Sequence, residues 1–411
     1  MDFKAASSDT MLELEDALER ILSAVQPLGE ETVPLNSAVG RVLAGPVASP
    51  VDIPLFDNSA MDGYAVRAAD VAAACEQNPV SLQVGGRIAA GEMSEGSVDA
   101  GTCVRLFTGS PLPRGADAVV MQEDTRTDPV NSDKVRFIDS VRPWENVRLR
   151  GEDVKRETVL VQGGGRLTAG HVALLAAAGV KEVRAGRQPI AALLATGSEL
   201  VEPGQPLRPG AIYESNRLML SAQARQAGAV ARVFPLVPDT LSAAREALHA
   251  ALADSDVLVT SGGVSVGEFD FVKKAFEQLG GHLDFWRVSI KPGRPFVFGR
   301  AEGKFLFGLP GNPVSALVTF LLLARPALLR LQGAADTGLP KSTGRLAETL
   351  TNPSDRRHFM RVVVDDSGQV RSTGAQASHI LSSLARANGL VDVPPKASLA
   401  SGTMISVLRW D

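Results

Sequence analysis

The spacing of apolar residues divides the chain into stretches of different predicted structure. Residues 10–25 carry apolar side chains at positions 11, 14, 18, 21, 22 and 25, which is the spacing of one helix face. From about residue 45 to residue 161, short valine-rich runs alternate with proline and glycine, which predicts a β-rich insert. From about residue 341 onward, short apolar runs again predict a small β domain.

Apolar strands and helical stretches alternate between residues 190 and 331. Strands are predicted at 190–195, 230–236, 256–260, 296–298 and 305–307, and helices at 216–226, 240–252, 270–279 and 313–331. Such alternation is typical of a mostly parallel sheet covered by helices. Ligands bind to these sheets beyond the carboxyl ends of the strands, so the loops at those ends are the expected place for chemistry.

Composition and charge exclude several classes of protein. The 411 residues, 45% of them hydrophobic, are enough for about two to four globular domains. The formal charge of −4 excludes a broad basic surface for nucleic acid. Two cysteines and an N-terminus without the basic region of a signal peptide favour a cytoplasmic location. The longest apolar stretch, 317–331, contains Arg325, Pro326 and Arg330, which argues against a membrane span.

Two loops after predicted strands carry residue types that bind anions. In the first loop, paired glycines can point backbone N–H groups at a phosphate. In the second loop, a helix begins with an N-cap asparagine and a first-turn proline. The candidate substrate-binding residues of these loops are Ser261, Gly262, Gly263, Ser265, Pro310, Gly311, Asn312 and Pro313. A tight connection without a ligand remains the alternative for each loop.

Charged residues lie near the same loops. The candidate cations are Arg287, Lys291 and Arg294. Even spacing on one extended segment predicts that Arg287 and Lys291 face the same anion. The candidate Mg²⁺ ligands are the carboxylates Glu199, Asp239 and Asp270, because Mg²⁺ prefers oxygen ligands beside a phosphorylated molecule. A solvated run of charges and ordinary helix caps are the alternatives.

Other polar residues give weaker signals. Asp62 and Asp153 lie next to glycine in turns of the predicted insert, where an Asx-type turn is the simpler interpretation. The five histidines have no metal-ligand spacing, and we interpret them as structural or surface residues. They are His171, His249, His282, His358 and His379.

A series of ordered motifs covers nearly the whole chain. They are DNSAMDGYAV at 57–66, LFTGSPLPRGADAVVMQED at 106–124, RGEDV at 150–154, ATGSEL at 195–200, SGGVSVGEFD at 261–270, IKPGRPFVFG at 290–299, GLPGNPVSA at 308–316 and LSSLARANGL at 381–390. Together they resemble the molybdopterin molybdenumtransferase family, the bacterial relatives of the gephyrin E domain.

The resemblance implies a multidomain α/β plus β fold. It implies a helical, discontinuous linking domain at 1–48 and 158–188 and a β-rich insert at 49–157. It further implies an α/β molybdopterin-binding domain at 189–337, similar to molybdopterin adenylyltransferases, and a C-terminal β barrel at 338–411. A homodimer is also implied, in which the insert of one subunit reaches across to the other.

The implied reaction inserts molybdenum from molybdate into adenylylated molybdopterin, with Mg²⁺-dependent release of AMP. The acidic positions of the family match Asp62, Asp153, Glu199, Asp239 and Asp270, and its basic positions match Lys291 and Arg287. Arg287 stands where the bacterial enzymes commonly have lysine. Arg294, Ser378 and Arg356 are further candidates for contact with the substrates, the last two near molybdate. A turn serine without a ligand is the alternative for Ser378.

Two alternatives stay open at this point. One is a dimeric interaction scaffold of the gephyrin type, and the other is adenylylation of molybdopterin by the α/β domain. As an enzyme, the chain is expected to make transient contact with a separate molybdopterin adenylyltransferase and with enzymes that accept the cofactor. No nucleic acid or membrane partner is expected.

Overall fold

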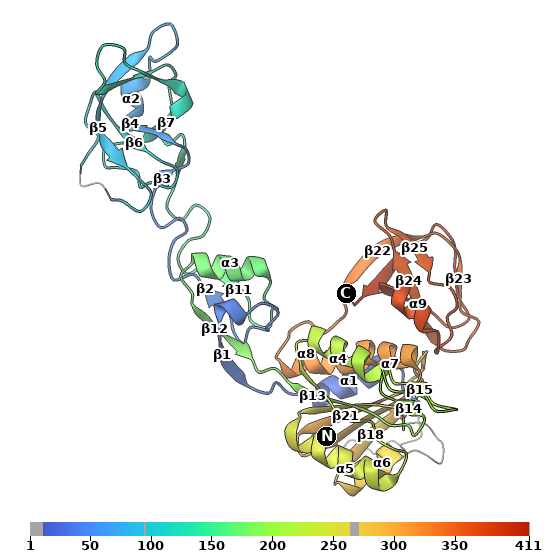
Figure 1. Ribbon diagram of the computed structural model, residues 1–411. Coiled ribbons are helices and arrows are strands. Elements are labelled where there is room, and N and C mark those ends of the chain that lie inside the picture. The colour runs from blue at the N-terminus through green and yellow to red at the C-terminus, as the bar shows by residue number, and fades with distance from the viewer. Residues whose placement is uncertain (1–10, 94–95, 264–270, 411) are drawn as a thin grey trace.

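The computed structural model describes residues 11–93, 96–263 and 271–410. Figure 1 shows an extended molecule, with a β-rich insert at one end, a small linking domain in the middle, and an α/β domain with a C-terminal β domain at the other end. The two ends are therefore far apart within one chain, which matters for residues of the insert that were predicted to act in the site.

The α/β domain contains a six-stranded sheet. Its strands lie in the order β16 (Val230–Val233), β13 (Ile190–Ala195), β17 (Val257–Ser261), β21 (Lys304–Leu309), β20 (Pro295–Ala301) and β18 (His282–Arg287). The first four strands are parallel and the last two are antiparallel to their neighbours. The prediction of a mostly parallel sheet between residues 190 and 331 is confirmed.

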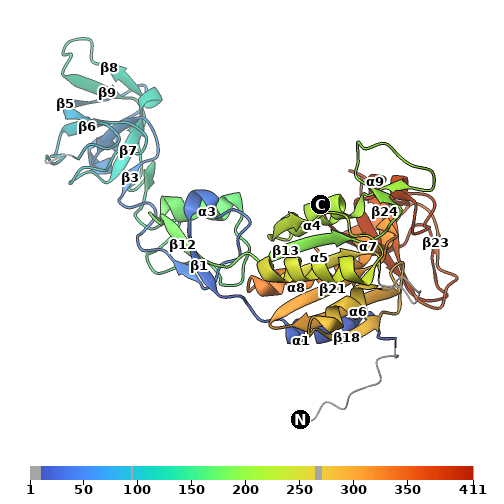
Figure 2. The same ribbon diagram turned by 60° about the horizontal axis from the view of Figure 1, so that its bottom comes forward.

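Helices cover both faces of this sheet. The helices are α4 (Asn216–Gln226), α5 (Leu241–Asp254), α6 (Phe271–Gln278), and a long helix made of α7 (Pro313–Thr319), the π-helical η3 (Phe320–Ala324) and α8 (Arg325–Leu331). Side chains of β13 alternate between the two cores, with Leu193 on the side of α4 and α8 and Leu194 on the side of α5 and α6. The sheet is thus buried on both faces, as parallel sheets usually are (Figure 2).

The first helix, α1 (Leu14–Ala24), belongs to the same core. Ala17 and Ile21 are fully buried in the cluster that includes α8, and Leu12 forms a bridge with Val288. We had expected residues 1–48 to fold together with 158–188. The helix instead packs on the α/β domain, because its apolar face, with Leu14, Ala17 and Ile21, is buried against η3 and α8 of the long helix.

The linking domain is made from two separate parts of the chain. Strand β1 (Glu30–Pro34) pairs with β12 (Glu182–Gly186), and β2 (Val47–Ala48) pairs with β11 (Val159–Val161). The short helix η1 (Leu35–Ser37) and helix α3 (Ala169–Ala177) complete it. Thr168 caps α3 by accepting a hydrogen bond from the His171 backbone N–H, while the His171 side chain accepts from the Thr168 backbone.

The insert is built on another six-stranded sheet. Its strands are, in order, β7 (Ala118–Met121), β4 (Gly63–Val66), β6 (Thr102–Leu106), β5 (Val80–Ile88), β9 (Lys134–Phe137) and β8 (Thr125–Thr127). Strands β3 (Asn58–Ser59) and β10 (Val147–Arg148) pair below it, and α2 (Ala68–Val71) and η2 (Gln122–Asp124) connect strands. The β-rich character predicted for this stretch is confirmed.

The C-terminal domain is a closed barrel. Strands β24 (Arg357–Val364), β25 (Gln369–Ser372), β22 (Lys341–Leu346), β28 (Met404–Arg409) and β26 (Gly389–Val393) follow one another, and β26 pairs back with β24. Strands β23 (Leu350–Thr351) and β27 (Ser398–Leu399) and helix α9 (Leu381–Arg386) lie at its ends. Strand β19 (Ile290–Lys291) leaves the α/β domain and pairs with β24, so the two domains share a sheet edge.

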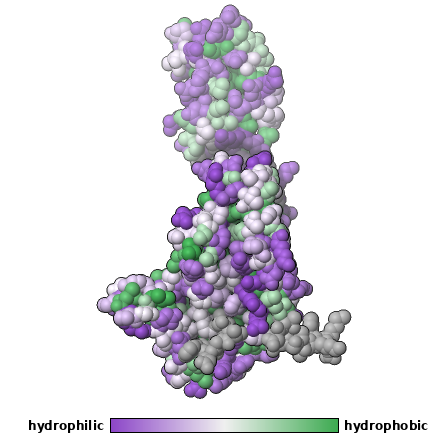
Figure 3. All heavy atoms as spheres, turned by 90° about the vertical axis from the view of Figure 1, so that its right-hand side faces the viewer, coloured by the Kyte–Doolittle hydropathy of each residue, from purple (hydrophilic) through white to green (hydrophobic). Residues whose placement is uncertain are grey.

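Among the described residues, one helix is long and apolar enough to be compared with a membrane span. It comprises Pro313–Leu331, but 89% of its apolar 18-residue window is buried inside the protein, which is the environment of a core helix. On the face shown in Figure 3, hydrophilic residues cover much of both the insert and the α/β end, and apolar residues form small separate groups.

Candidate functional site

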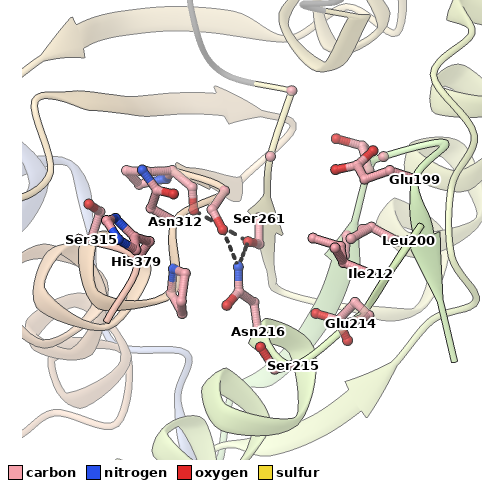
Figure 4. A pocket seen from close by; sticks show the side chains of 18 of the residues that line it. Glu199, Leu200, Ile212, Glu214, Ser215, Asn216, Ser261, Asn312, Ser315 and His379 are labelled. Atoms are coloured by element: carbon pink, nitrogen blue, oxygen red, sulfur yellow. Dashed lines mark hydrogen bonds between the residues drawn. The ribbon is translucent and has the colours of Figure 1, made fainter. Parts of the chain in front are cut away.

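A cavity of about 850 Å³ lies at the carboxyl ends of β13, β17 and β21, with the barrel on one side (Figure 4). This is the position where open α/β sheets bind ligands. The predicted site residues that line it are Glu199, Asp239, Ser261, Gly262, Gly263, Pro310, Gly311, Asn312 and Pro313. The sequence thus identified residues from four loops that the fold brings together.

The turn after β17 requires glycine at two positions. Gly262 and Gly263 have φ values of +87° and +67°, and a Cβ at either would lie 2.6–2.7 Å from atoms of Thr196. The Gly262 N–H donates to the Leu309 carbonyl at 3.1 Å. The two glycines are therefore required at least for the tight turn that follows β17. Ser265 and Asp270, predicted in the same loop, lie outside the described residues.

Asn216, at the start of α4, joins the cavity loops. Its Nδ2 donates to Ser261 Oγ at 2.7 Å and to the Gly311 carbonyl at 2.7 Å, and Ser261 Oγ donates to the Pro310 carbonyl at 3.3 Å (Figure 4). Asn216 is only 8% exposed. The sequence predicts the start of the helix here but gives no signal for the role of Asn216, because its hydrogen-bond partners are distant in sequence.

Carboxylates dominate the charge of the cavity lining. Asp239 Oδ2 accepts from the Ser198 N–H at 2.7 Å, and the Asp239 N–H donates to Ser198 Oγ at 3.0 Å. Glu199 is exposed within the cavity. Glu214, for which the sequence gives no signal, is buried and accepts from both the backbone N–H and Nε of Arg217, at 2.8 and 3.0 Å. Glu214 is thus already compensated, whereas Glu199 and Asp239 remain available.

The predicted cations lie elsewhere. No lysine or arginine is found among the described residues that line the cavity. The Arg287 guanidinium lies 4.2 Å from the centre of the Trp286 ring, and Arg294 is exposed. The prediction that Arg287 and Lys291 share one face of an extended segment is wrong. Arg287 ends β18 in the α/β sheet, whereas Lys291 lies in β19, which pairs with the barrel.

A loop of the barrel closes one side of the cavity. Ser378 accepts from Asn312 Nδ2 on its Oγ at 3.1 Å and from the Val314 N–H on its carbonyl at 3.2 Å, so it caps the helix that begins at Pro313. The next residue, His379, lines the cavity beside Asn312 and Ser315 (Figure 4). We had interpreted His379 as structural or surface; the structure places it at the site.

Three cations surround a buried histidine at the junction of the two domains. Burial and the nearby charges of Lys291, Arg361 and Arg356 lower the pKa of His358 to about 4. Arg356 Nη1 also donates to the Ile290 carbonyl at 2.9 Å. Lys291 and Arg356, both predicted to contact substrate, therefore belong to one positive cluster, although neither lines the cavity itself.

Neither Asp62 nor Asp153 lines this cavity, and Asp62 lies between β3 and β4 of the insert, at the opposite end of the molecule from the α/β domain (Figure 1). Asp62 Oδ1 accepts from the Thr108 N–H at 2.8 Å and from Thr108 Oγ1 at 2.9 Å, and these bonds lower the pKa of Asp62. Asp153 is exposed, and its N–H donates to the Ile53 carbonyl at 3.1 Å. One chain alone does not bring them to the other predicted residues.

No group of three or more histidine, cysteine, aspartate or glutamate side chains within the described ranges has the arrangement of a metal site. Glu199 and Asp239 nevertheless provide two carboxylates in the cavity. Mg²⁺ in proteins is commonly held by one or two carboxylates together with substrate phosphates and water. The donor set therefore fits Mg²⁺ that arrives with a phosphorylated substrate.

Three protein families match successive parts of the chain. The MoeA N-terminal region (domain I and II) matches residues 12–179, a probable molybdopterin binding domain matches 192–330, and the MoeA C-terminal region (domain IV) matches 343–410. These matches include the segments that form the insert, the cavity and the barrel.

Relatives and solved structures match over nearly the full length. Molybdopterin molybdenumtransferase 2 of Mycobacterium tuberculosis is 40% identical over 97% of this chain and 98% of its own, and the molybdopterin molybdenumtransferase of Haemophilus influenzae is 37% identical over the same shares. A crystal structure of a molybdopterin biosynthesis MoeA protein from Pyrococcus horikoshii is 31% identical, with a TM-score of 0.82, and covers 97% of this chain and 100% of its own.

Proposed function

Because the chain belongs to the molybdopterin molybdenumtransferase family, transferases of molybdenum cofactor biosynthesis, we propose that it moves molybdenum from molybdate into adenylylated molybdopterin and releases AMP. The observation that carries this proposal is the cavity at the strand ends. Its volume of about 850 Å³ is near the upper part of the usual range for small-molecule sites, as a nucleotide-linked pterin requires.

The charge of the cavity supports a role for Mg²⁺. A diphosphate placed beside Glu199 and Asp239 would meet like charges, and no lysine or arginine of the described lining offsets them. Mg²⁺ held by these carboxylates would neutralise the phosphates and polarise the bond to AMP. Asp239 is well placed to present a carboxylate oxygen, because its Oδ2 bond to the Ser198 N–H fixes the side chain.

The protein's own groups would orient the substrate. Helix geometry leaves the N–H groups of Asn312 and Ser315 without a partner inside the helix, and both residues line the cavity. Such N–H groups favour anionic oxygens. Asn216 keeps the β17 and β21 loops at a fixed separation, so the phosphate-binding groups would be in place before the substrate arrives.

We place molybdate near the positive cluster of Lys291 and Arg356, beside the barrel loop that carries Ser378. A dianion requires compensating charge, and these two cations lie together at the domain junction. Arg294 remains a candidate for contact with the substrates, although it is exposed in this chain. Molybdenum would take its sulfur ligands from the pterin substrate, so the protein needs no cluster of thiolates there.

The distance between Asp62 or Asp153 and the cavity supports a homodimer. If these acids take part in the reaction, they must come from the insert of a second copy, because the insert of the same chain lies at the far end (Figure 1). Contacts with a separate adenylyltransferase and with cofactor-accepting enzymes, and a cytoplasmic location, stay predictions.

The proposal is tested with purified protein, adenylylated molybdopterin, molybdate and Mg²⁺. AMP release that requires both molybdate and Mg²⁺, and that a chelator stops, would support it. Consumption of ATP with molybdopterin, independent of molybdate, would favour adenylylation instead. Absence of molybdate-dependent AMP release together with tight binding of a receptor peptide would favour the scaffold alternative.

A further inference from the structure

Residues 374–379 of the barrel, here called the barrel loop, form part of the cavity wall. Ser378 of this loop binds both Asn312 and the Val314 N–H at the start of α7, and His379 lines the cavity. The cavity belongs to the α/β domain, but its shape depends on where the barrel holds this loop.

Arg361, in the middle of β24, holds the barrel loop by hydrogen bonds. It is fully buried, and its Nη2 donates to the Ala375 carbonyl at 2.8 Å and to the Ala377 carbonyl at 3.2 Å. Gln376, between them, accepts from the Arg361 N–H and donates to the Arg361 carbonyl, both at 2.9 Å. One residue thus binds three consecutive residues of the loop.

Stability alone does not account for this arginine. Its Nε and Nη1 have no hydrogen-bond partner among the described residues, and burial lowers its pKa to about 10. A buried cation without a carboxylate is unfavourable, and an apolar side chain of similar volume is often as stable or more stable in such a position. The presence of this arginine is therefore best explained by the barrel loop, which its hydrogen bonds hold in position.

We infer that Arg361 is a positioning residue, whose guanidinium holds the barrel loop so that Ser378 and His379 meet the start of α7 and complete the substrate cavity. It does not touch the substrate itself. The identity of the substrates rests on the proposed function, whereas the contacts between Arg361, the loop and α7 do not.

The test is Arg361→Met in the full-length protein, with two measurements. Hydrogen exchange of the Val314 amide, which Ser378 protects, should become faster by about tenfold or more, the equivalent of one lost hydrogen bond. The KM for molybdate should rise by about tenfold with a smaller change in kcat, because a mobile loop weakens pre-organised binding. The urea midpoint should stay unchanged or increase.

Arg357→Met is the matched control. Arg357 lies on the same strand but pairs with Asp392 and Glu15, so this variant weakens contact between the barrel and α1 without touching the loop. It should lower stability and leave Val314 exchange and the KM for molybdate near wild type. Arg361→Lys keeps a charged donor on a shorter side chain, so its exchange should lie between those of wild type and Arg361→Met.

Unchanged Val314 exchange in Arg361→Met would overturn the inference. If that variant fails to fold, Arg361→Gln, which keeps a polar side chain but lacks the guanidinium that binds the Ala375 and Ala377 carbonyls, must show the same faster exchange, or the inference is wrong. If the wild type releases no AMP, the proposed function fails, and the exchange measurement still decides the role of Arg361.

Discussion

Asn216 Nδ2 and Ser261 Oγ lie 2.7 Å apart, and this hydrogen bond joins the start of α4 to the end of β17 across 45 residues of sequence. The same amide nitrogen also donates to the Gly311 carbonyl. A single buried side chain therefore sets the spacing of three of the segments that surround the cavity.

Replacing Asn216 by alanine should loosen the cavity. The variant leaves Ser261 Oγ and the Gly311 carbonyl without their donor, so the free energy of unfolding should fall by about 1–3 kcal/mol. The KM for adenylylated molybdopterin should rise by about tenfold or more, because the loops lose their fixed spacing. Urea unfolding and steady-state AMP release measure the two effects.

Asn388→Ala is the control for this prediction. Asn388 makes two comparable bonds with the Val364 backbone, at 2.8 and 2.9 Å, but lies in the barrel. It should lower stability by a similar amount and leave the KM unchanged. An equal rise of KM in both variants would mean that Asn216 acts only through general stability.

Asp239→Asn separates the charge of this residue from its role in the loop. Asparagine keeps an oxygen that can accept from the Ser198 N–H, so folding should be unaffected. Molybdate-dependent AMP release at fixed Mg²⁺ should fall by about 10²-fold, the scale of one lost electrostatic contact, and additional Mg²⁺ should restore part of it. The exposed Asp254, paired with Arg232 on the domain surface, provides the control variant Asp254→Asn. A wild-type rate and Mg²⁺ requirement in Asp239→Asn would remove Asp239 from the metal site.

Mixed dimers test whether Asp62 acts in the partner's cavity. Asp62→Ala and Asp239→Ala should each be inactive alone. After subunit exchange, the mixture should regain about a quarter of the wild-type rate, since half the two-fold dimers are mixed and each mixed dimer has one intact site. Exchange is followed independently by mass spectrometry of differently tagged subunits. Fully exchanged but inactive mixtures would show that the site is not shared in this way.

The local sequence pattern was sufficient to predict the part of the site that lies at the edge of the α/β sheet. Glu199, Asp239 and Ser261 could be placed together because the carboxyl ends of parallel strands meet at one edge, and the alternation of strands and helices was clear. Resemblance to a family added the barrel and the insert, which the composition alone described only as β-rich.

The remaining features depend on how domains pack. His379 reaches the cavity only because the barrel docks against α7, and no local pattern in the loop encodes that contact. Arg287 and Lys291 were placed on one strand because they lie four positions apart in the sequence. The chain instead changes from one sheet to another between these residues, a tertiary event that residue spacing does not reveal.

His358 should make the stability of the protein depend on pH in a definite window. Its pKa is about 4 in the folded protein and 6.5 in the unfolded chain, because it is buried beside Lys291, Arg361 and Arg356. Between these pH values the unfolded chain binds more protons than the folded protein, so stability falls as the pH decreases from 6.5 to 4. Titration of His358 over the whole window should lower the free energy of unfolding by about 3 kcal/mol, because each unit of pKa difference between the folded and unfolded states corresponds to about 1.36 kcal/mol.

The variant His358→Gln has no such titration, so its unfolding free energy should decrease less than that of the wild type over this window. Urea unfolding at several pH values between 7 and 4 measures both curves. Carboxylates titrate in both proteins, and the difference between the curves therefore isolates His358. His249→Gln, at an exposed position of α5, should retain the wild-type dependence. Parallel curves for wild type and His358→Gln would show that His358 is protonated equally in the folded and unfolded states, and that the three neighbouring cations do not act on it.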